Sequence, residues 1–220
     1  MKLKVPLIRQ ATDSSDCIFA ALSMVLAYYK IVKPVSQLKA EIEDWFVPSV
    51  AIYLLELGFE VEIVTAHPKL FTLQNIKLSQ KQIRKRFFDL QLMDANNHDD
   101  EMVLHYYIEF LDKGGRVKVA VPGIEDIGSE ITAGRPLIAI IDQNILGGDY
   151  PGSYLHANTI VGYNSKEIHV LDPLWNEMGG EKSWPIANYL YAITIGIRYD
   201  LDHGTLIKIH PNWEKIKHQG

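Results

Sequence analysis

The sequence predicts a single α+β domain, and three observations lead to that prediction. The earlier segments have the apolar spacing of helices, whereas the later ones are short apolar runs separated by turn residues. The 220 residues fit one domain, or one domain with an added flap. Hydrophobic residues make up 47% of the chain and charged residues 22%, which are ordinary values for a globular protein with a full core.

The helical half begins with its strongest segment, residues 18–30. This segment is apolar on nearly every side, so we expect it to be well buried. The residues just before it, Asp13, Ser14, Ser15 and Asp16, are candidates for its N-cap. The other predicted helices are residues 36–45 (capped by Ser36), a helix opening at Pro48-Ser49 and ending at Gly58, and residues 79–92, 99–113 and 124–133.

The sheet half follows a strand predicted at residues 59–65. Residues 157–163 and 167–171 are apolar runs separated by Asn164-Ser165, which predicts an antiparallel hairpin. The remaining segments are predicted strands at 136–142, 193–199 and 205–210, a loop at 143–155 and a short helix at 184–191.

Charge and composition exclude several classes of protein. Lysine and arginine number 22 and aspartate and glutamate 27, so the net charge of −5 argues against a nucleic-acid-binding protein. The only cysteine is Cys17, which rules out an intramolecular disulfide and a cysteine-rich zinc site. No apolar run is long enough for a membrane span or a signal peptide. We therefore expect a soluble cytoplasmic protein.

Cys17 stands at the start of the buried helix, where unpaired N–H groups and the helix dipole stabilise a thiolate. A nucleophilic thiolate needs a histidine to move its proton, and the histidine needs an acceptor to orient it. His156 begins one strand of the hairpin and Asp172 ends the other, so antiparallel pairing predicts that they are neighbours. Taken one by one, the three residues are equally well explained as a packed thiol, an exposed histidine and an Asp-Pro turn.

In combination, these residues resemble the papain-like cysteine peptidases, and more closely the C39 peptidase family. Its members carry a glutamine, then an acidic residue and a cysteine that open a helix ending in Tyr-Tyr, then a His-led strand ending in Val-Gly-Tyr, and Asp-Pro after the next strand. The matching residues here are Gln10, Asp16-Cys17, Tyr28-Tyr29, His156, Val161-Gly162-Tyr163 and Asp172-Pro173. The Cys17-to-His156 spacing, 156 − 17 = 139, fits the roughly 130–150 residues of papain-type enzymes.

The resemblance covers residues 6–29 and 136–173 and has two departures. The family usually has glycine after the nucleophile, where this chain has Ile18, and the spacing from Gln10 to Cys17 is one residue longer than usual. Residues of about 63–117 match no motif. The predicted organisation is one C39-like domain over 1–220 with a helical insertion at 63–117, in a stand-alone member without transporter domains.

The resemblance implies a papain-like fold, with a helical half that carries Cys17 and an antiparallel sheet half that carries His156 and Asp172. It implies thiol-dependent hydrolysis of a peptide or acyl-amide substrate, with Cys17 as nucleophile, His156 as base and acid, Asp172 as orienting residue, and the Cys17 N–H with Gln10 as oxyanion donors. No metal or organic cofactor is implied. An acyltransferase on the same fold and a non-catalytic peptide-binding module remain alternatives.

Two other clusters of residues are weaker indications of function. His98, Asp99, Asp100 and His105 could form a metal site of a hydrolase, but the two aspartates are explained by the start of a helix. Lys81, Arg84, Lys85 and Arg86 form a basic cluster that is best interpreted as a solvated helix face, with docking of an acidic partner as the alternative.

Overall fold

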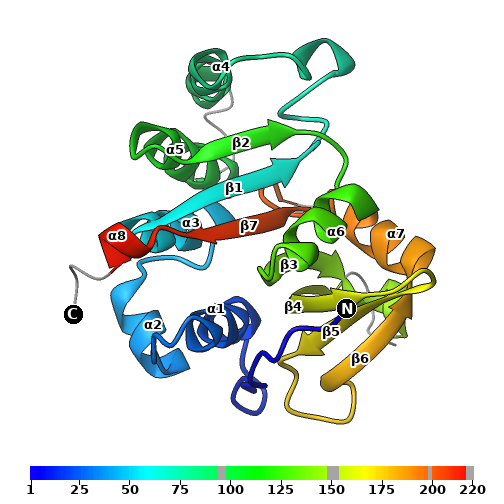
Figure 1. The fold of residues 1–220 in the computed structure, drawn as a ribbon. Helices are drawn as coiled ribbons and strands as arrows, with labels where there is room; N and C mark the ends of the chain where they lie inside the picture. Colours follow the sequence, from blue (N-terminus) through cyan, green and yellow to red (C-terminus); the bar gives the residue numbers. More distant parts are fainter. Residues whose placement is uncertain (94–97, 148–153, 198–199, 217–220) are drawn as a thin grey trace.

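A seven-stranded sheet runs through the part of the chain that the computed structural model describes, residues 1–93, 98–147, 154–197 and 200–216 (Figure 1). Its strand order is β2-β1-β7-β3-β4-β5-β6. All neighbouring strands are antiparallel except β1 and β2, which are parallel. The strands are β1 (Phe59–Thr65), β2 (Arg116–Val119), β3 (Leu137–Asp142), β4 (Leu155–Tyr163), β5 (Glu167–Asp172), β6 (Gly180–Pro185) and β7 (Leu206–Pro211).

The last strand, β7, joins the two parts of the sheet. It pairs with β1 on one side and with β3 on the other. A segment near the C-terminus therefore connects β1, the strand of the helical half, to β3, which in turn pairs with β4 of the predicted hairpin. The helices are α1 (Cys17–Tyr28), α2 (Val35–Glu41), α3 (Val47–Glu56), α4 (Gln80–Met93), α5 (His98–Asp112), α6 (Ile124–Thr132), α7 (Ile186–Gly196) and α8 (Trp213–Ile216), with short 3-10 turns η1 (Leu73–Asn75) and η2 (Gln143–Leu146).

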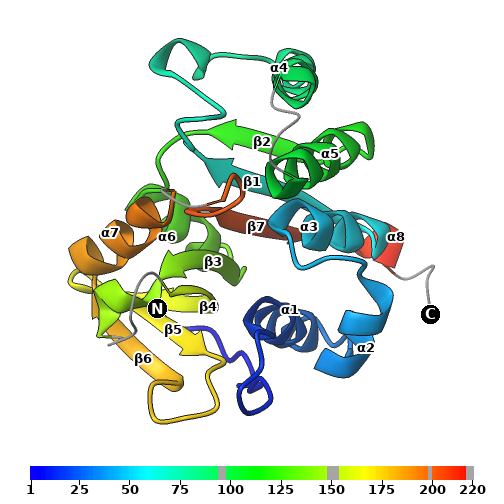
Figure 2. The same ribbon diagram turned by 180° about the vertical axis from the view of Figure 1, so that it is seen from behind.

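The two faces of the sheet bury separate cores, because side chains alternate along each strand. On β3, Ile138 and Ile140 point into the first core, which is formed with α1, α3, α4 and α5. Ala139 and Ile141 point into the second core, which is formed with α6 and α7. Figures 1 and 2 show these two groups of helices on the two sides of the sheet. This arrangement confirms the predicted α+β class, with a helical half and a mainly antiparallel sheet half.

Helix α1 is buried along most of its length, as its composition predicts. Residues 18–26 are all buried, and the helix packs on β4, where the Thr159 hydroxyl donates a hydrogen bond of 3.3 Å to the Ala21 carbonyl. Asp16 occupies the N-cap position, but its side chain does not cap the helix and instead forms an ion pair of 2.7 Å with Lys39. The packing of an all-round apolar helix therefore fixes where Cys17 lies.

Most of the predicted elements are present, with shifted ends. The hairpin is confirmed as β4 and β5, and α3 ends before Gly58, whose φ of +88° is the left-handed conformation expected there. Helix α2 begins after Pro34 rather than at Ser36 and ends at Glu41. In the predicted loop, η2 occupies the first residues and residues 148–153 lie outside the described part of the chain.

The strand predicted at residues 193–199 is wrong for residues 193–196, because α7 continues to Gly196, and residues 198–199 lie outside the described part of the chain. The buried positions of α7, Tyr189, Ala192, Ile193 and Gly196, have the i, i+3, i+4, i+7 spacing of a helix on the second core. Trp184, predicted at the start of that helix, belongs to β6 instead.

Two short strands, β2 and β6, were not predicted from the sequence. Strand β2 has four residues, two of them charged and exposed, and β6 is an edge strand with alternating exposure. Such segments have little apolar signal of their own and become strands because a neighbouring strand offers backbone partners.

Residues 63–117, which match no motif, belong to the first core rather than to a separate body. Phe87 of α4 and Tyr107 of α5 are both fully buried there, with ring centroids 4.9 Å apart. That this region is an insertion relative to the family stays a prediction. In the described part of the chain, none of the helices has both the length and the hydropathy needed to cross a membrane.

The adjacent residues Phe87 and Phe88 provide a matched test of this packing. Phe87 is fully buried and Phe88 is 47% exposed. We expect Phe87→Ala to lower the free energy of unfolding by about 3–5 kcal/mol and Phe88→Ala by less than about 1 kcal/mol, both measured by urea denaturation. A separate early transition in Phe87→Ala, with the rest of the protein unchanged, would show that residues 63–117 fold as an independent unit.

Candidate active site

Cys17 is the first residue of α1, and its side chain lies half-buried at the edge of a cavity. Its Sγ lies close enough to the backbone N–H groups of Ile18 and Ala157 and to the side chain of His156 for all three to stabilise a thiolate. The first of these donors belongs to the helix start, and the other two belong to β4. The thiol is therefore held where the helical half meets the sheet half.

His156 and Asp172 are in direct contact, as the hairpin predicts. His156 Nε2 lies 2.8 Å from Asp172 Oδ1, and each side chain is only 1% exposed. The backbone N–H of Leu174 donates to the same Asp172 oxygen at 2.9 Å. Because Nε2 is engaged by Asp172, Nδ1 is the ring nitrogen that remains for Cys17.

The pKa values of the two groups shift in opposite directions. Burial by itself raises the pKa of the Cys17 thiol, but the hydrogen bond and charge of His156, together with the two backbone N–H groups, lower it below its usual value. For His156, burial acts in the other direction and lowers the pKa, because it disfavours the charged imidazolium. The interactions with Asp172 and Cys17 outweigh this effect and raise the pKa of His156 to about 9. These directions favour a thiolate beside an imidazolium at neutral pH.

A second polar layer lies beneath His156 and Asp172. Asn158 is fully buried on β4, and the Tyr189 hydroxyl of α7 donates a hydrogen bond to its side-chain oxygen. Thr159 pairs with Leu171, so Asn158 and Asp172 occupy the next facing positions on the two strands. This layer was not predicted from the sequence, although Asn158, two residues after His156 on a strand, points to the same face.

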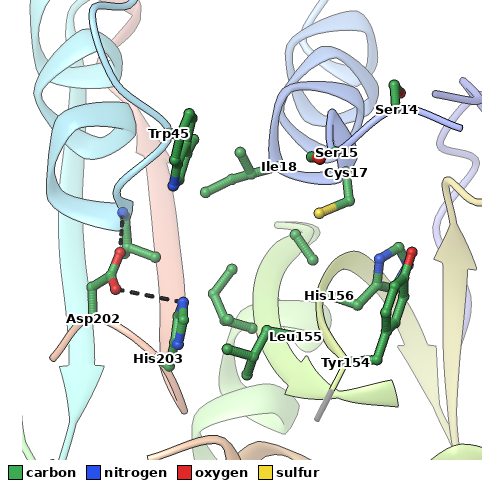
Figure 3. Close-up of a pocket in the computed structure, with 13 residues that line it drawn as sticks. Ser14, Ser15, Cys17, Ile18, Trp45, Tyr154, Leu155, His156, Asp202 and His203 are labelled. Carbon is green, nitrogen blue, oxygen red and sulfur yellow. Dashed lines mark hydrogen bonds and ion pairs between the residues drawn. The ribbon is translucent and has the colours of Figure 1, made fainter. Parts of the chain in front are cut away.

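The cavity beside Cys17 has a volume of about 310 Å³. Figure 3 shows it between Cys17 and His156 on one side and Trp45, Asp202 and His203 on the other. The 13 residues that line it are Ser14, Ser15, Cys17, Ile18, Trp45, Val47, Ile140, Tyr154, Leu155, His156, Ala157, Asp202 and His203. Tyr154 and Leu155, at the end of the predicted loop 143–155, are among these residues.

These observations can be set beside known proteins. The model of the family described as "Peptidase_C39 like family" matches residues 2–192, which is most of the chain. The chain belongs to this family. As a C39-like protein it is a cysteine peptidase-like hydrolase by family.

Solved structures with a similar fold include three C39 peptidases. One is a double glycine motif protease from an AMS/PCAT transporter in complex with its leader peptide (16% identity, 96% of this chain and 94% of that chain covered, TM-score 0.48). The second is a C39-like peptidase from Bacillus anthracis (14% identity, 95% of this chain and 97% of that chain covered, TM-score 0.48). The third is the peptidase domain of Streptococcus ComA, a bifunctional ABC transporter involved in quorum sensing (13% identity, 94% of this chain and 98% of that chain covered, TM-score 0.48). No curated protein matches the chain.

Gln10 of this C39-like protein lies near the end of β5 and is not among the residues that line the cavity. Its backbone N–H donates to the Pro173 carbonyl at 2.8 Å, which ties its loop to the end of β5. Its side chain is 4% exposed, and Nε2 donates one hydrogen to the Ser14 carbonyl. The amide nitrogen has a second hydrogen, so the role of Gln10 as an oxyanion donor stays a prediction.

The metal site considered for the C39-like protein finds no support in its geometry. Among the described residues, no group of three or more histidine, cysteine, aspartate or glutamate side chains is placed to hold an ion. Asp100 is buried in an ion pair of 2.9 Å with Lys69. In the basic cluster, Arg84 and Lys85 pair with Asp112 and Asp89 on the protein's own surface.

The paired pKa shifts predict the reactivity of Cys17. Iodoacetamide should label the wild-type protein well below pH 8, and His156→Ala should slow labelling at pH 6 by at least about tenfold, because the thiol pKa returns toward its ordinary value of about 8.5. His105→Ala, which removes an exposed histidine, is the control and should leave the profile unchanged. A wild-type profile that follows an ordinary thiol titration would contradict the thiolate–imidazolium pair.

The same shifts predict how stability depends on pH. The folded-state pKa of His156 lies near 9, above the ordinary 6.5, so its protonation stabilises the folded state fully below about pH 6.5. That contribution is lost as the pH rises through about 9. The lowered thiol pKa of Cys17 acts in the opposite direction, because its contribution to stability grows up to the ordinary thiol pKa of about 8.5. Urea titrations above about pH 8.5 should therefore show the loss, and it should be smaller in His156→Ala than in the wild type.

Proposed function

We propose that the protein hydrolyses a peptide or amide bond through Cys17, His156 and Asp172. The observation that carries the proposal is the position of the His156 imidazole, which bonds Asp172 Oδ1 at 2.8 Å through Nε2 and lies close enough to Cys17 to lower the pKa of its thiol. A histidine in this position can take a proton from a thiol and return it to a leaving group. The cavity beside Sγ gives a substrate carbonyl room to approach.

In the first half of the reaction, the Cys17 thiolate attacks the carbonyl carbon and forms the C–S bond. The negative charge moves to the carbonyl oxygen, where the N–H of Cys17 at the start of α1 can stabilise it, with Gln10 as a second donor. The tetrahedral intermediate then collapses and the C–N bond breaks. The His156 imidazolium gives its proton to the leaving amine, which departs and leaves a thioester on Cys17.

In the second half, neutral His156 takes a proton from a water molecule as the oxygen attacks the thioester. Collapse of this second intermediate releases the carboxylic acid, and the thiolate–imidazolium pair is restored. Asp172 does not exchange a proton in either half. Its Oδ1 holds the Nε2–H of His156 and so keeps Nδ1 directed at the thiol, in a setting only 1% exposed to water.

Variants of the triad residues test the proposal. Cys17→Ala removes the nucleophile, so turnover should fall by at least about a thousandfold while substrate binding persists. Asp172→Asn keeps an oxygen that can accept from His156 and from Leu174, so its loss of turnover should be at least about tenfold milder than that of Cys17→Ala. The circular dichroism spectra of both variants should match that of the wild type.

The measurement is incubation of wild type and Cys17→Ala with a library of peptides and acyl-amides, read by mass spectrometry for products and for an adduct on residue 17. Hydrolysis products with wild type alone support the proposal. An adduct that resolves only after an amine or thiol is added would identify an acyltransferase. Equal binding to both proteins, with neither adduct nor product, would identify a non-catalytic binding module.

A further inference from the structure

The cavity beside Cys17 has chemically different ends. At one end are the thiol and His156, and at the other are Asp202 and His203, which come from the segment just before β7 (Figure 3). Asp202 and His203 lie beyond residue 192, the last residue matched by the family model. A substrate residue next to the bond under attack therefore faces an acidic group that lies outside the matched part of the chain.

Asp202 is a buried carboxylate with only one of its oxygens satisfied by a hydrogen bond. Its side chain is 3% exposed, and Oδ2 accepts the backbone N–H of Val47 at 2.7 Å. Among the described residues, Oδ1 has no hydrogen-bond partner, and its nearest charged neighbour is His203 Nε2 at 3.7 Å. Burial raises the pKa of Asp202, although the charge of His203 and the N–H of Val47 act in the opposite direction.

The structural role of Asp202 does not require a carboxylate. One oxygen suffices to accept the N–H of Val47 at the start of α3, and an asparagine could provide it. The carboxylate instead brings a buried negative charge, which is costly unless a positive charge compensates for it. The 13 residues that line the cavity include no lysine or arginine, and His203, 3.7 Å from Oδ1, is the one basic side chain among them beside Asp202.

The walls of the cavity suit the stem of a long side chain. Ile18, Val47 and Leu155 supply apolar surface, and the indole of Trp45, 67% exposed, forms one side. A tryptophan face attracts a cation within about 6 Å of the ring centroid, and lysine and arginine bury their apolar stems while keeping the charged head in a polar setting. The walls and the acidic end thus favour the same kind of group.

We infer that this cavity binds the side chain of a substrate residue close to the scissile bond and prefers lysine or arginine there. The inference rests on the proposed function, since it names the substrate class of the same site. The stem of the side chain packs against Ile18 and Leu155, the cation lies by Trp45 and His203, and its charge compensates for that of Asp202.

Peptide libraries test the preference. Each position flanking the scissile bond is varied among lysine, arginine, norleucine, glutamine and glutamate, and kcat/KM is measured by mass spectrometry. At one position, lysine should exceed its neutral counterpart norleucine by at least about tenfold in wild type, and the ratio should fall toward one in Asp202→Asn. Equal cleavage of lysine and norleucine at every position, or an unchanged ratio in Asp202→Asn, would overturn the inference.

The control for the change in net charge is Asp112→Asn. Asp112 lies at the end of α5 and pairs with Arg84, and it does not line the cavity. It should keep the wild-type ratio of lysine to norleucine. If Asp202→Asn does not fold, the wild-type library and Trp45→Leu, which should lower the same ratio, still decide the question.

Alkylation of Cys17 provides a readout that does not depend on turnover. The rates of labelling by cationic 2-bromoethylamine, neutral iodoacetamide and anionic iodoacetate are compared in wild type and Asp202→Asn. The ratio of cationic to anionic rates should fall several-fold in Asp202→Asn and stay unchanged in Asp112→Asn, because only Asp202 places its charge at the cavity.

The two readouts separate failure of this inference from failure of the proposed function. Cleavage without any preference for a basic residue overturns the inference and leaves the proposed hydrolysis intact. A cation preference in alkylation without cleavage of any peptide or amide supports the acidic character of the cavity and overturns the proposed hydrolysis.

Discussion

The hydrogen bond between His156 and Asp172 is the contact around which the site is arranged. Both side chains are almost fully buried, so each depends on the other to satisfy a polar group that water cannot reach. The bond exists because β4 and β5 pair antiparallel, which brings the beginning of one strand beside the end of the next. The Leu174 N–H on the same aspartate oxygen further restricts its position. A histidine held in this way presents its other nitrogen in a fixed direction.

Cys17 meets that nitrogen because of how α1 is packed. The helix is buried from residue 18 to residue 26, so it cannot slide or rotate without disturbing the first core. Its first turn is thereby held against β4, where the N–H of Ala157 reaches the sulfur. The helix start contributes backbone N–H groups and the sheet contributes the histidine. The reactive pair is thus a consequence of packing the helical half on the sheet half.

The ionisable side chains of the site are buried, and their neighbours offset only part of the free-energy cost of burying their charges. Burial opposes the charged forms of Cys17 and His156, yet each stabilises the charge of the other. Asp202, at the far end of the cavity, is buried with no hydrogen bond to Oδ1 among the described residues, and His203 Nε2, 3.7 Å away, is the charged neighbour of that oxygen. A positively charged substrate group bound there would offset the negative charge of Asp202. The proposed chemistry and the inferred substrate class therefore rest on the same physical constraint.

The features that depend on local pattern could be predicted from the sequence alone. The apolar helix at Cys17, the hairpin and the neighbouring positions of His156 and Asp172 follow from periodicity, turn residues and antiparallel pairing, and the family follows from the motifs at those residues. The end of α7 was predicted as a strand because Ile193–Gly196 contains β-branched residues. These residues are helical in the structure because one face of α7 packs on the second core. Strands β2 and β6 were missed because they depend on partners elsewhere in the chain.

The surroundings of Cys17 and His156 depend on three-dimensional packing that the sequence did not predict. Trp45 comes from the segment before α3 and Asp202 and His203 from the segment before β7, and no motif connects these residues with Cys17. They line one cavity because β7 inserts between β1 and β3 and brings the two halves together. Such contacts join residues far apart in the chain, and their energy depends on burial and orientation that a local pattern does not encode.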